Sequence, residues 1–313
     1  MRAEEVERVW DVGTVWGVAS LPGGSINGAF RVRAEAGDLH LRVYRTEDRA
    51  RVEREHAAIA LAVGAGIPTP RPLERRAGGT VGRLGEAFAA LFPVAPGAPA
   101  PRGELTPAHA AALGALLADL HDRLPVSAPF EVPGLGVSSV ERTVERLERV
   151  RAVILALPRP DEVDGWALER TRQRLAYLRT SPLPDCPPAF PARFLHGDYH
   201  DGNVFFEGER PIALIDWEGT RLAPRAWEVV RCLHLSLRLD PALGVPFLAA
   251  YRARLSLPAG ELADGAALYV LMQERNVWTY ESVYLEGNPG PKVFILPPPY
   301  VPLGQAWAES GLA

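Results

Sequence analysis

A segment rich in proline and glycine, APGAPAPRGE at residues 95–104, separates two parts of the chain with different hydrophobic patterns. Before it, apolar residues mostly alternate with polar ones, as in half-buried strands. After Leu105, apolar residues recur every three or four positions, as in amphipathic helices. Strands followed by helices favour an α+β fold over an alternating β-α-β sheet. We therefore predict two lobes, a small β-sheet lobe over residues 1–95 and a larger, mainly helical lobe over residues 96–313.

The first lobe is expected to contain several strands and one helix. The stretch FRVRAEAGDLHLRVYR has the alternation of a hairpin that turns at Ala-Gly-Asp. Thr46 is expected to cap a helix, because threonine is a common N-cap residue. This helix should end near residues 64–66, before Pro68. The apolar stretch EAFAALFPV is expected to add another strand.

The second lobe is expected to be built mainly from helices. Thr106 and Pro107 predict the start of one, since proline fits the first turn. Amphipathic patterns predict two more over residues 138–157 and 162–179, and further helices up to about residue 286. We expect the proline-rich tail from Gly287 to be irregular.

The composition limits which partners we expect. The net charge of −4 gives no electrostatic reason to bind nucleic acid. No apolar run reaches the roughly 18 residues of a membrane span, and the N-terminal residues lack the apolar segment of a signal peptide. The two cysteines, Cys186 and Cys232, form no disulfide framework. We therefore expect a cytoplasmic protein without nucleic-acid or membrane partners, and its oligomeric state stays open.

Residues 196–204, HGDYHDGNV, hold two histidines, two aspartates and one asparagine, and IDWE follows at residues 215–218. One interpretation is an ordinary polar turn, since Asp, Asn and Gly favour turns, but it leaves IDWE unexplained. Another is a zinc hydrolase that uses both histidines and Asp198. A catalytic zinc needs a further strong ligand, and the nearby candidate is His234, on a predicted helix.

A third interpretation is phosphoryl transfer. In the kinase loop H-R-D-x-x-x-x-N, the aspartate accepts the proton of the substrate hydroxyl and the asparagine binds Mg²⁺. His196, Asp198 and Asn203 have this spacing. Asp216 supplies the second metal-binding aspartate after the predicted hairpin VFFEGERPIAL. Such a hairpin places the two strand ends side by side, so that Asn203 and Asp216 could share one ion. Both supply oxygen atoms, and Mg²⁺ prefers oxygen ligands and takes few of them from protein.

HGDYHDGN followed by IDWE resembles the signature of the aminoglycoside phosphotransferase-like family, which includes choline kinases, homoserine kinases and methylthioribose kinases. The resemblance covers roughly residues 15–285. It implies the bilobal fold of protein kinases, ATP and Mg²⁺ as cofactors, and a small molecule with a hydroxyl group as substrate. It also implies that Asp198 is the catalytic residue and that Asn203 and Asp216 bind the metal.

The resemblance extends to the expected ATP contacts of the first lobe. GGSINGAFRV at residues 23–32 is similar to the family's nucleotide-binding loop, so that Ser25 and Asn27 should lie near the phosphates. The family places a lysine or arginine on its third strand. Because the chain's single lysine is Lys292, the resemblance implies that Arg42 binds the α- and β-phosphates.

The same resemblance assigns a carboxylate and an adenine site. The helix after Arg42 should carry the glutamate that pairs with it, and Glu55 is the expected residue, with Glu53 as the alternative. FAALFPVAPG is similar to the linker between lobes, where backbone groups from Phe92 to Val94 would bind the adenine.

The acceptor is expected between the catalytic loop and the helices predicted within residues 138–180. Asp201 stands where the family often has proline, and its carboxylate is expected either to contact a cationic substrate or to be simply solvated. Glu218 is common in the family and is a candidate for a second metal bound through water. Glu274, Trp278 and Glu281 have the i, i+4, i+7 spacing of one helix face. Such a face would suit an amine-bearing acceptor, and it equally fits an amphipathic helix that packs through Trp278.

We therefore predict an ATP- and Mg²⁺-dependent kinase that transfers a phosphoryl group to a hydroxyl of an aminoglycoside, amino alcohol or sugar. Two alternatives stay open. One is an inactive nucleotide-binding regulatory protein, against which the intact set Asp198, Asn203 and Asp216 argues. The other is a Ser/Thr protein kinase, but nothing like an A-P-E segment or a long activation loop follows Asp216.

Overall fold

The computed structural model of the protein describes residues 2–21, 27–101, 103–181 and 191–312. The chain divides into two compact units. Unit 1 comprises residues 1–134 and 191–257, and unit 2 comprises residues 135–190 and 258–313. The lobe boundary predicted at residue 95 lies inside unit 1 and stays a prediction.

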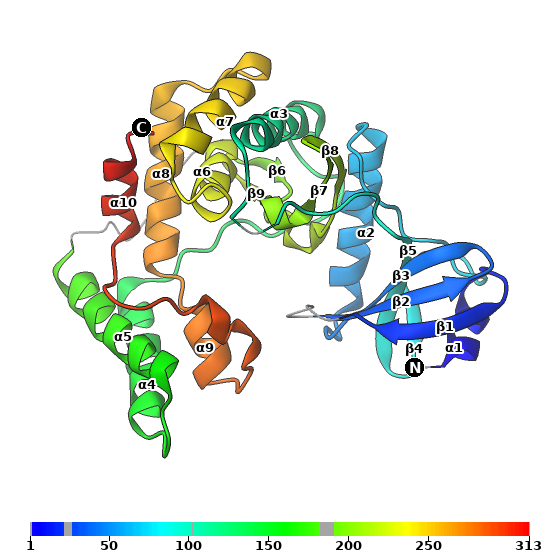
Figure 1. Cartoon of the computed structure of the whole chain (residues 1–313), viewed down its shortest axis with the longest axis horizontal. Coiled ribbons are helices and arrows are strands. Elements are labelled where there is room, and N and C mark those ends of the chain that lie inside the picture. Colours follow the sequence, from blue (N-terminus) through cyan, green and yellow to red (C-terminus); the bar gives the residue numbers. More distant parts are fainter. Residues whose placement is uncertain (1, 22–26, 102, 182–190, 313) are drawn as a thin grey trace. The chain divides into compact units, whose positions relative to one another are not determined.

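The N-terminal part of unit 1 is a five-stranded antiparallel sheet in the order β1-β2-β3-β5-β4 (Figure 1). Its strands are β1 (Val15–Ser20), β2 (Gly28–Ala34), β3 (Gly37–Val43), β4 (Gly82–Leu84) and β5 (Ala87–Pro93). The predicted hairpin is confirmed as β2 and β3, and the predicted apolar strand is confirmed as β5. The register places Arg42 of β3 between Ala29 and Ala90.

Two helices accompany this sheet. Helix α1 (Ala3–Val9) packs its buried Val6 into the core of the sheet beside Leu41 and Leu91. Helix α2 (Arg49–Gly64) begins after Asp48, whose carboxylate accepts hydrogen bonds from the amides of residues 50 and 51. The prediction that Thr46 caps this helix is wrong, because its hydroxyl instead accepts from the Asp48 amide.

The second part of unit 1 combines helices with two short two-stranded sheets, β6-β9 and β7-β8. Its helices are α3 (Pro107–Arg123), α6 (Arg225–Leu235) and α7 (Pro241–Arg254), and its 3-10 turns are η1 (Asp201–Asn203) and η2 (Trp217–Gly219). Its strands are β6 (Arg193–Leu195), β7 (Val204–Glu207), β8 (Arg210–Leu214) and β9 (Arg221–Ala223). The start of α3 at Thr106 and Pro107 is confirmed, and so is the β7–β8 hairpin.

Helices α3 and α7 pack against each other at Gly114. A Cβ atom at this position would lie 2.1 Å from the carbonyl oxygen of Phe247. Only glycine permits this backbone approach without a shift of one helix. The contact places α3 close to α7, and both helices support the loop of residues 196–203 described below.

Unit 2 is helical. It contains α4 (Val140–Leu155), α5 (Glu162–Thr180), α8 (Ala259–Glu274), α9 (Trp278–Tyr284), η3 (Gly290–Phe294) and α10 (Leu303–Ser310). The two helices predicted near residues 138–157 and 162–179 are confirmed. The irregular tail is only partly correct, because α10 forms after the prolines of residues 297–302.

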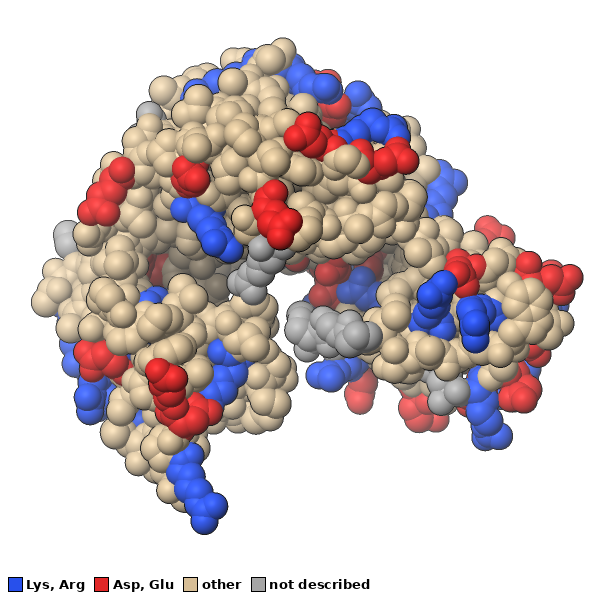
Figure 2. All heavy atoms as spheres, in the orientation of Figure 1, with Lys and Arg blue, Asp and Glu red and all other residues tan. Residues whose placement is uncertain are grey.

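Acidic and basic side chains are interspersed on the face of the molecule shown in Figure 2. Among the helices in the described ranges, none combines the length and apolar character that a membrane crossing requires.

Candidate active site

The β7–β8 hairpin brings the two predicted metal ligands to neighbouring strand ends. Asn203 precedes β7, and Asp216 follows β8 by two residues. Val204 pairs with Leu214, and the amide of Ile215 donates to the carbonyl of Asn203 at 2.9 Å. Asn203 and Asp216 therefore lie on adjacent chain segments, as the hairpin interpretation predicted.

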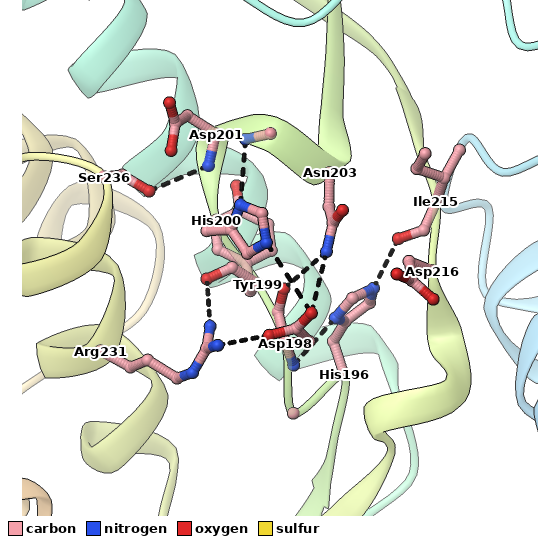
Figure 3. A network of polar contacts seen from close by, with 12 residues as sticks. His196, Asp198, Tyr199, His200, Asp201, Asn203, Ile215, Asp216, Arg231 and Ser236 are labelled. Carbon is pink, nitrogen blue, oxygen red and sulfur yellow. Dashed lines mark hydrogen bonds and ion pairs between the residues drawn. The ribbon is translucent and has the colours of Figure 1, made fainter. Parts of the chain in front are cut away.

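Asp198 is held on both of its oxygens (Figure 3). Its Oδ1 forms an ion pair with Arg231. Its Oδ2 accepts from Asn203 Nδ2 at 3.3 Å and lies 3.7 Å from His200 Nε2. Burial raises the pKa of Asp198, but His200 and the charge of Arg231 lower it to about 2. The carboxylate is therefore ionised at neutral pH and oriented before any substrate arrives.

The side chain of Asn203 leaves one atom for a cation. Its Nδ2 donates to the carbonyl and to the carboxylate of Asp198, at 3.0 and 3.3 Å. The amide oxygen Oδ1 is thus the acceptor left for a ligand. Asp216 has a left-handed backbone with φ of 66° and ψ of 62°, a conformation that is uncommon without glycine and concentrates at functional sites.

A second charged group forms around Arg42. Its guanidinium lies 2.9 Å from Glu55, 3.2 Å from Asp216 and 2.7 Å from Glu218. Burial lowers the pKa of Arg42, but the charges of Glu55 and Asp216 outweigh burial and raise it. Burial raises the pKa of Glu55 to about 7 against the effect of Arg42, and repulsion from Asp216 and Glu218 adds to it. One cation thus faces three carboxylates.

The structure distinguishes the two glutamates that were candidates for this pair. Glu55 is buried and points to Arg42, whereas Glu53 is exposed and pairs with Arg49 on the helix surface. Asn27 also joins the group, because its Nδ2 donates to Glu218 Oε2 at 3.1 Å. Ser25 lies outside the described residues.

Next to Arg42 is a cavity of about 530 Å³. Its polar lining is contributed by Asn27, His40, Arg42, Glu55, Thr69, Asp216 and Glu218. Its apolar lining is contributed by Leu21, Ala29, Ile59, Pro70, Phe92, Pro93, Val94, Ala95, Phe205 and Ile215. The predicted adenine contacts Phe92 and Val94 line the apolar part. Since Pro93 has no N–H group, a backbone donor between residues 92 and 94 has to come from Phe92 or Val94.

His196 is a structural residue. It is fully buried, its Nδ1 accepts from the Asp198 amide at 3.2 Å, and its Nε2–H donates to the Ile215 carbonyl at 3.0 Å. Neither nitrogen is left to bind zinc. In addition, the described residues contain no group of three or more His, Cys, Asp and Glu side chains placed to hold a metal ion. The geometry therefore does not support the zinc hydrolase.

The loop of residues 196–203 is anchored to three helices through buried polar groups. Glu228 of α6 accepts from the amide of Gly197. It also accepts from His121 Nε2 of α3 at 3.0 Å, and Tyr251 of α7 donates to His121 Nδ1 at 2.8 Å. Burial lowers the pKa of His121, which favours its neutral form. Tyr199 completes the anchor, because its hydroxyl donates to an α3 carbonyl at 2.8 Å.

Gly197 lets this loop pass close to the segment after Asp216. Its φ is +81°, and a Cβ atom there would lie 2.0 Å from the carbonyl oxygen of Gly219. An L-residue at position 197 would meet both backbone strain and a clash. The contact fixes the loop that carries Asp198 against the turn that carries Glu218.

The candidate acceptor residues are not brought together as predicted. Glu274, Trp278 and Glu281 do not share one helix face, because α8 ends at Glu274 and α9 starts at Trp278. Glu274 is buried and bonded to the Tyr300 hydroxyl, and Glu281 forms an ion pair with Arg146. Trp278 is exposed.

Asp201 is held through its backbone. Its amide donates to Ser236 at 2.9 Å, and its carboxylate points away from Asp198 (Figure 3). Arg231, which does contact Asp198, was missed by the sequence analysis. No local sequence signal marked it, because it lies 33 positions from Asp198 on a separate helix.

Comparisons with known proteins identify a family and several relatives of this chain. The sequence profile of the phosphotransferase enzyme family matches residues 17–263. A homoserine kinase of Parvibaculum lavamentivorans is 27% identical over 74% of this chain and 68% of its own length.

Two solved structures are similar in fold at low sequence identity. A spectinomycin phosphotransferase in complex with ADP and spectinomycin has a TM-score of 0.69 at 17% identity, covering 94% of both chains. An amicoumacin kinase in complex with AMP-PNP and Ca²⁺ has a TM-score of 0.60 at 14% identity, covering 96% of this chain and 95% of its own. Both likenesses confirm the predicted kinase-like α+β fold. The chain belongs to the phosphotransferase enzyme family and is a small-molecule kinase.

Proposed function

We propose that this kinase uses ATP and Mg²⁺ to phosphorylate a hydroxyl group of a small amino acid or amino alcohol. The observation that carries the proposal is the convergence of Asp198, Asn203 and Asp216 at the β7–β8 hairpin, beside a cavity with one charged and one apolar part. Phosphoryl transfer needs these parts, namely an acceptor-orienting carboxylate, oxygen ligands for a cation and a site for a nucleotide.

The nucleotide is assigned to the cavity beside Arg42. Its apolar lining around Phe92 and Val94 suits a heterocyclic base, and Arg42 offers a planar fork to phosphate oxygens. Asn27 lies at the polar part, and Ser25 stays a proposed contact. The presence of ADP in one similar structure and AMP-PNP in another supports this assignment.

The metal is assigned to Asn203 Oδ1 and Asp216. These hard oxygen atoms fit Mg²⁺, which takes few ligands from protein and the rest from phosphates and water. The charge also fits, since Arg42 alone opposes three carboxylates. When bound, Mg²⁺ would hold phosphate oxygens and offset their charge. Glu218 is proposed to join through water.

Asp198 is proposed to orient the acceptor hydroxyl. The hydroxyl oxygen attacks the γ-phosphorus, the bond from phosphorus to the β–γ bridging oxygen breaks, and its electron pair leaves with ADP. Asp198 Oδ2 takes the hydroxyl proton as the new bond forms. With a pKa of about 2, the carboxylate is a weak base. Positioning therefore contributes more than proton abstraction, as in other phosphoryl transfers.

The acceptor class rests on the relatives. The homoserine kinase acts on a small amino acid with a hydroxyl group, so that homoserine is the first acceptor to test. Purified protein with ATP and Mg²⁺ should release ADP with homoserine or another small hydroxylated amine in a panel that includes sugars and spectinomycin. ADP release without any acceptor dependence across the panel would contradict the proposal. Nucleotide binding without turnover would instead favour the regulatory protein.

A further inference from the structure

Arg231 of α6 holds two consecutive residues of the catalytic loop. It lies 33 positions after Asp198, and its NH2 forms an ion pair with Asp198 Oδ1. Its NH1 donates to the Tyr199 carbonyl at 3.3 Å. The side chain is only 15% exposed. Because the guanidinium is a rigid planar fork, it fixes the carboxylate relative to the loop backbone.

A second side chain of α6, that of Glu228, binds the same loop. Glu228 lies one turn earlier on the same face of α6 and accepts from the amide of Gly197. Two side chains of one helix thus hold three consecutive residues, 197–199. Glu228 is itself held by buried His121. The orientation of Asp198 is therefore set by α6 and its neighbours in addition to the loop sequence.

Arg231 also determines which carboxylate oxygen is available. Oδ1 is occupied by the guanidinium, while Oδ2 faces Asn203 Nδ2 and the more distant His200. Resting on the proposed function, we infer that Arg231 is a positioning residue that presents Oδ2 of Asp198 to the acceptor hydroxyl. It acts through Asp198 and binds neither nucleotide nor metal.

The expected effect follows from geometry. Without Arg231, Oδ1 of Asp198 loses its ion pair and the carboxylate is held less firmly, through Oδ2. Misplacement of a reacting group by about 1 Å costs roughly 10²-fold in rate. We expect Arg231→Met to lower kcat by roughly 10- to 100-fold, with the KM for ATP within about threefold of the native value. Arg231→Lys should recover part of kcat, because one contact returns but the fork does not.

A double-mutant cycle tests whether Arg231 acts through Asp198. Arg231→Met is measured in the native background and in Asp198→Asn, by ADP release with the acceptor that gives turnover. If Arg231 works through the carboxylate, its removal should change the residual rate of Asp198→Asn by less than about threefold. A residue that only supports the fold would cost the same factor in both backgrounds, and that result would overturn the inference.

Two further measurements separate this inference from the proposed function. Arg252→Met is the matched control, since Arg252 of α7 donates to the Leu257 carbonyl away from the loop, and it should keep native turnover and melting temperature.

Hydrogen exchange is a second test, and it requires no enzymatic activity. In Arg231→Met, amides of residues 197–203 should exchange faster while those of α3 and α7 do not. Unchanged loop exchange would overturn the inference, whereas a native protein without turnover would refute only the proposed function.

Discussion

The site contains two clusters of charged side chains, one around Arg42 and one around Asp198, and they differ in their balance of positive and negative charge. Around Arg42, one guanidinium faces Glu55, Asp216 and Glu218, which leaves an excess of negative charge. Around Asp198, one carboxylate is held by Arg231 and approached by His200. The pKa shifts follow this balance, because burial and neighbouring carboxylates raise the pKa of Glu55 to about 7, while His200 and Arg231 outweigh burial and lower that of Asp198 to about 2.

This difference indicates that the two clusters have different roles. A group with excess negative charge is completed by a cation, and Asp216 belongs to that group. A carboxylate that is already neutralised by its neighbours has little need of a metal and serves instead to orient a polar group. The following variants are chosen to break one group while leaving the other intact.

The largest effect is expected at Asp198. Asp198→Asn should lower turnover by roughly 10²–10⁴, because the acceptor loses its orienting carboxylate. Nucleotide affinity, which depends on the other group, should stay within a few-fold. Steady-state ADP release and calorimetric ATP titration check both parts. Asp264→Asn, on the exposed surface of α8, is the control, and near-native turnover in Asp198→Asn would contradict the assignment.

Asp216→Ala should remove the metal dependence of ATP binding. The metal loses a charged ligand, and the group keeps one positive against two negative charges. We expect Mg²⁺ binding to weaken by more than the roughly 10- to 100-fold that follows loss of a residue that only supports a metal ligand. ATP titrations with and without Mg²⁺ measure this change. A tightly bound zinc ion that is lost in His196→Ala would instead support the zinc-hydrolase interpretation.

Arg42→Ala should weaken ATP binding by roughly 10- to 100-fold, the value of a charge-assisted hydrogen bond of about 1.5–3 kcal/mol. Adenosine, which lacks phosphates, should lose little affinity, and Arg42→Lys should recover part of the ATP affinity. The exposed Arg31 of β2, paired with Asp38, is the control position. Equal losses for ATP, AMP and adenosine would mean that Arg42 supports the fold only.

The smallest effect is expected at Glu55. Glu55→Gln should weaken ATP binding less than Arg42→Ala, since it removes only the partner that positions Arg42. It should also change how stability depends on pH in metal-free protein. With a pKa raised from about 4.5 to about 7 in the fold, Glu55 favours folding at low pH, and this contribution is lost as pH rises through 7.

Denaturant unfolding at several pH values measures this contribution. Between pH 4.5 and 7, the native free energy of unfolding should fall relative to Glu55→Gln by up to about 3 kcal/mol. Glu53→Gln is the matched control on the same helix, because Glu53 is exposed and paired only with Arg49. A pH profile of Glu55→Gln that parallels the native one would show that folding does not raise the pKa of Glu55.

Local signals in the sequence predicted several secondary-structure elements and part of the candidate site. The caps of α3, the alternation of β2 and β3, and the hairpin between Asn203 and Asp216 depend on residues close together in the chain, whose backbone preferences act over a few positions. The scarcity of lysine also directed attention to Arg42, because the third strand offers few other cations. The signature around Asp198 indicates the family without any tertiary information.

Contacts between distant residues were decided only by the tertiary structure. Glu55 rather than Glu53 meets Arg42 because the helical phase of α2 against the sheet buries one and exposes the other. The end of α8 at Glu274 separated residues whose spacing suggested one face. Arg231 reaches Asp198 across 33 positions, a contact that no local pattern encodes, because packing of α6 against the loop determines which side chains meet.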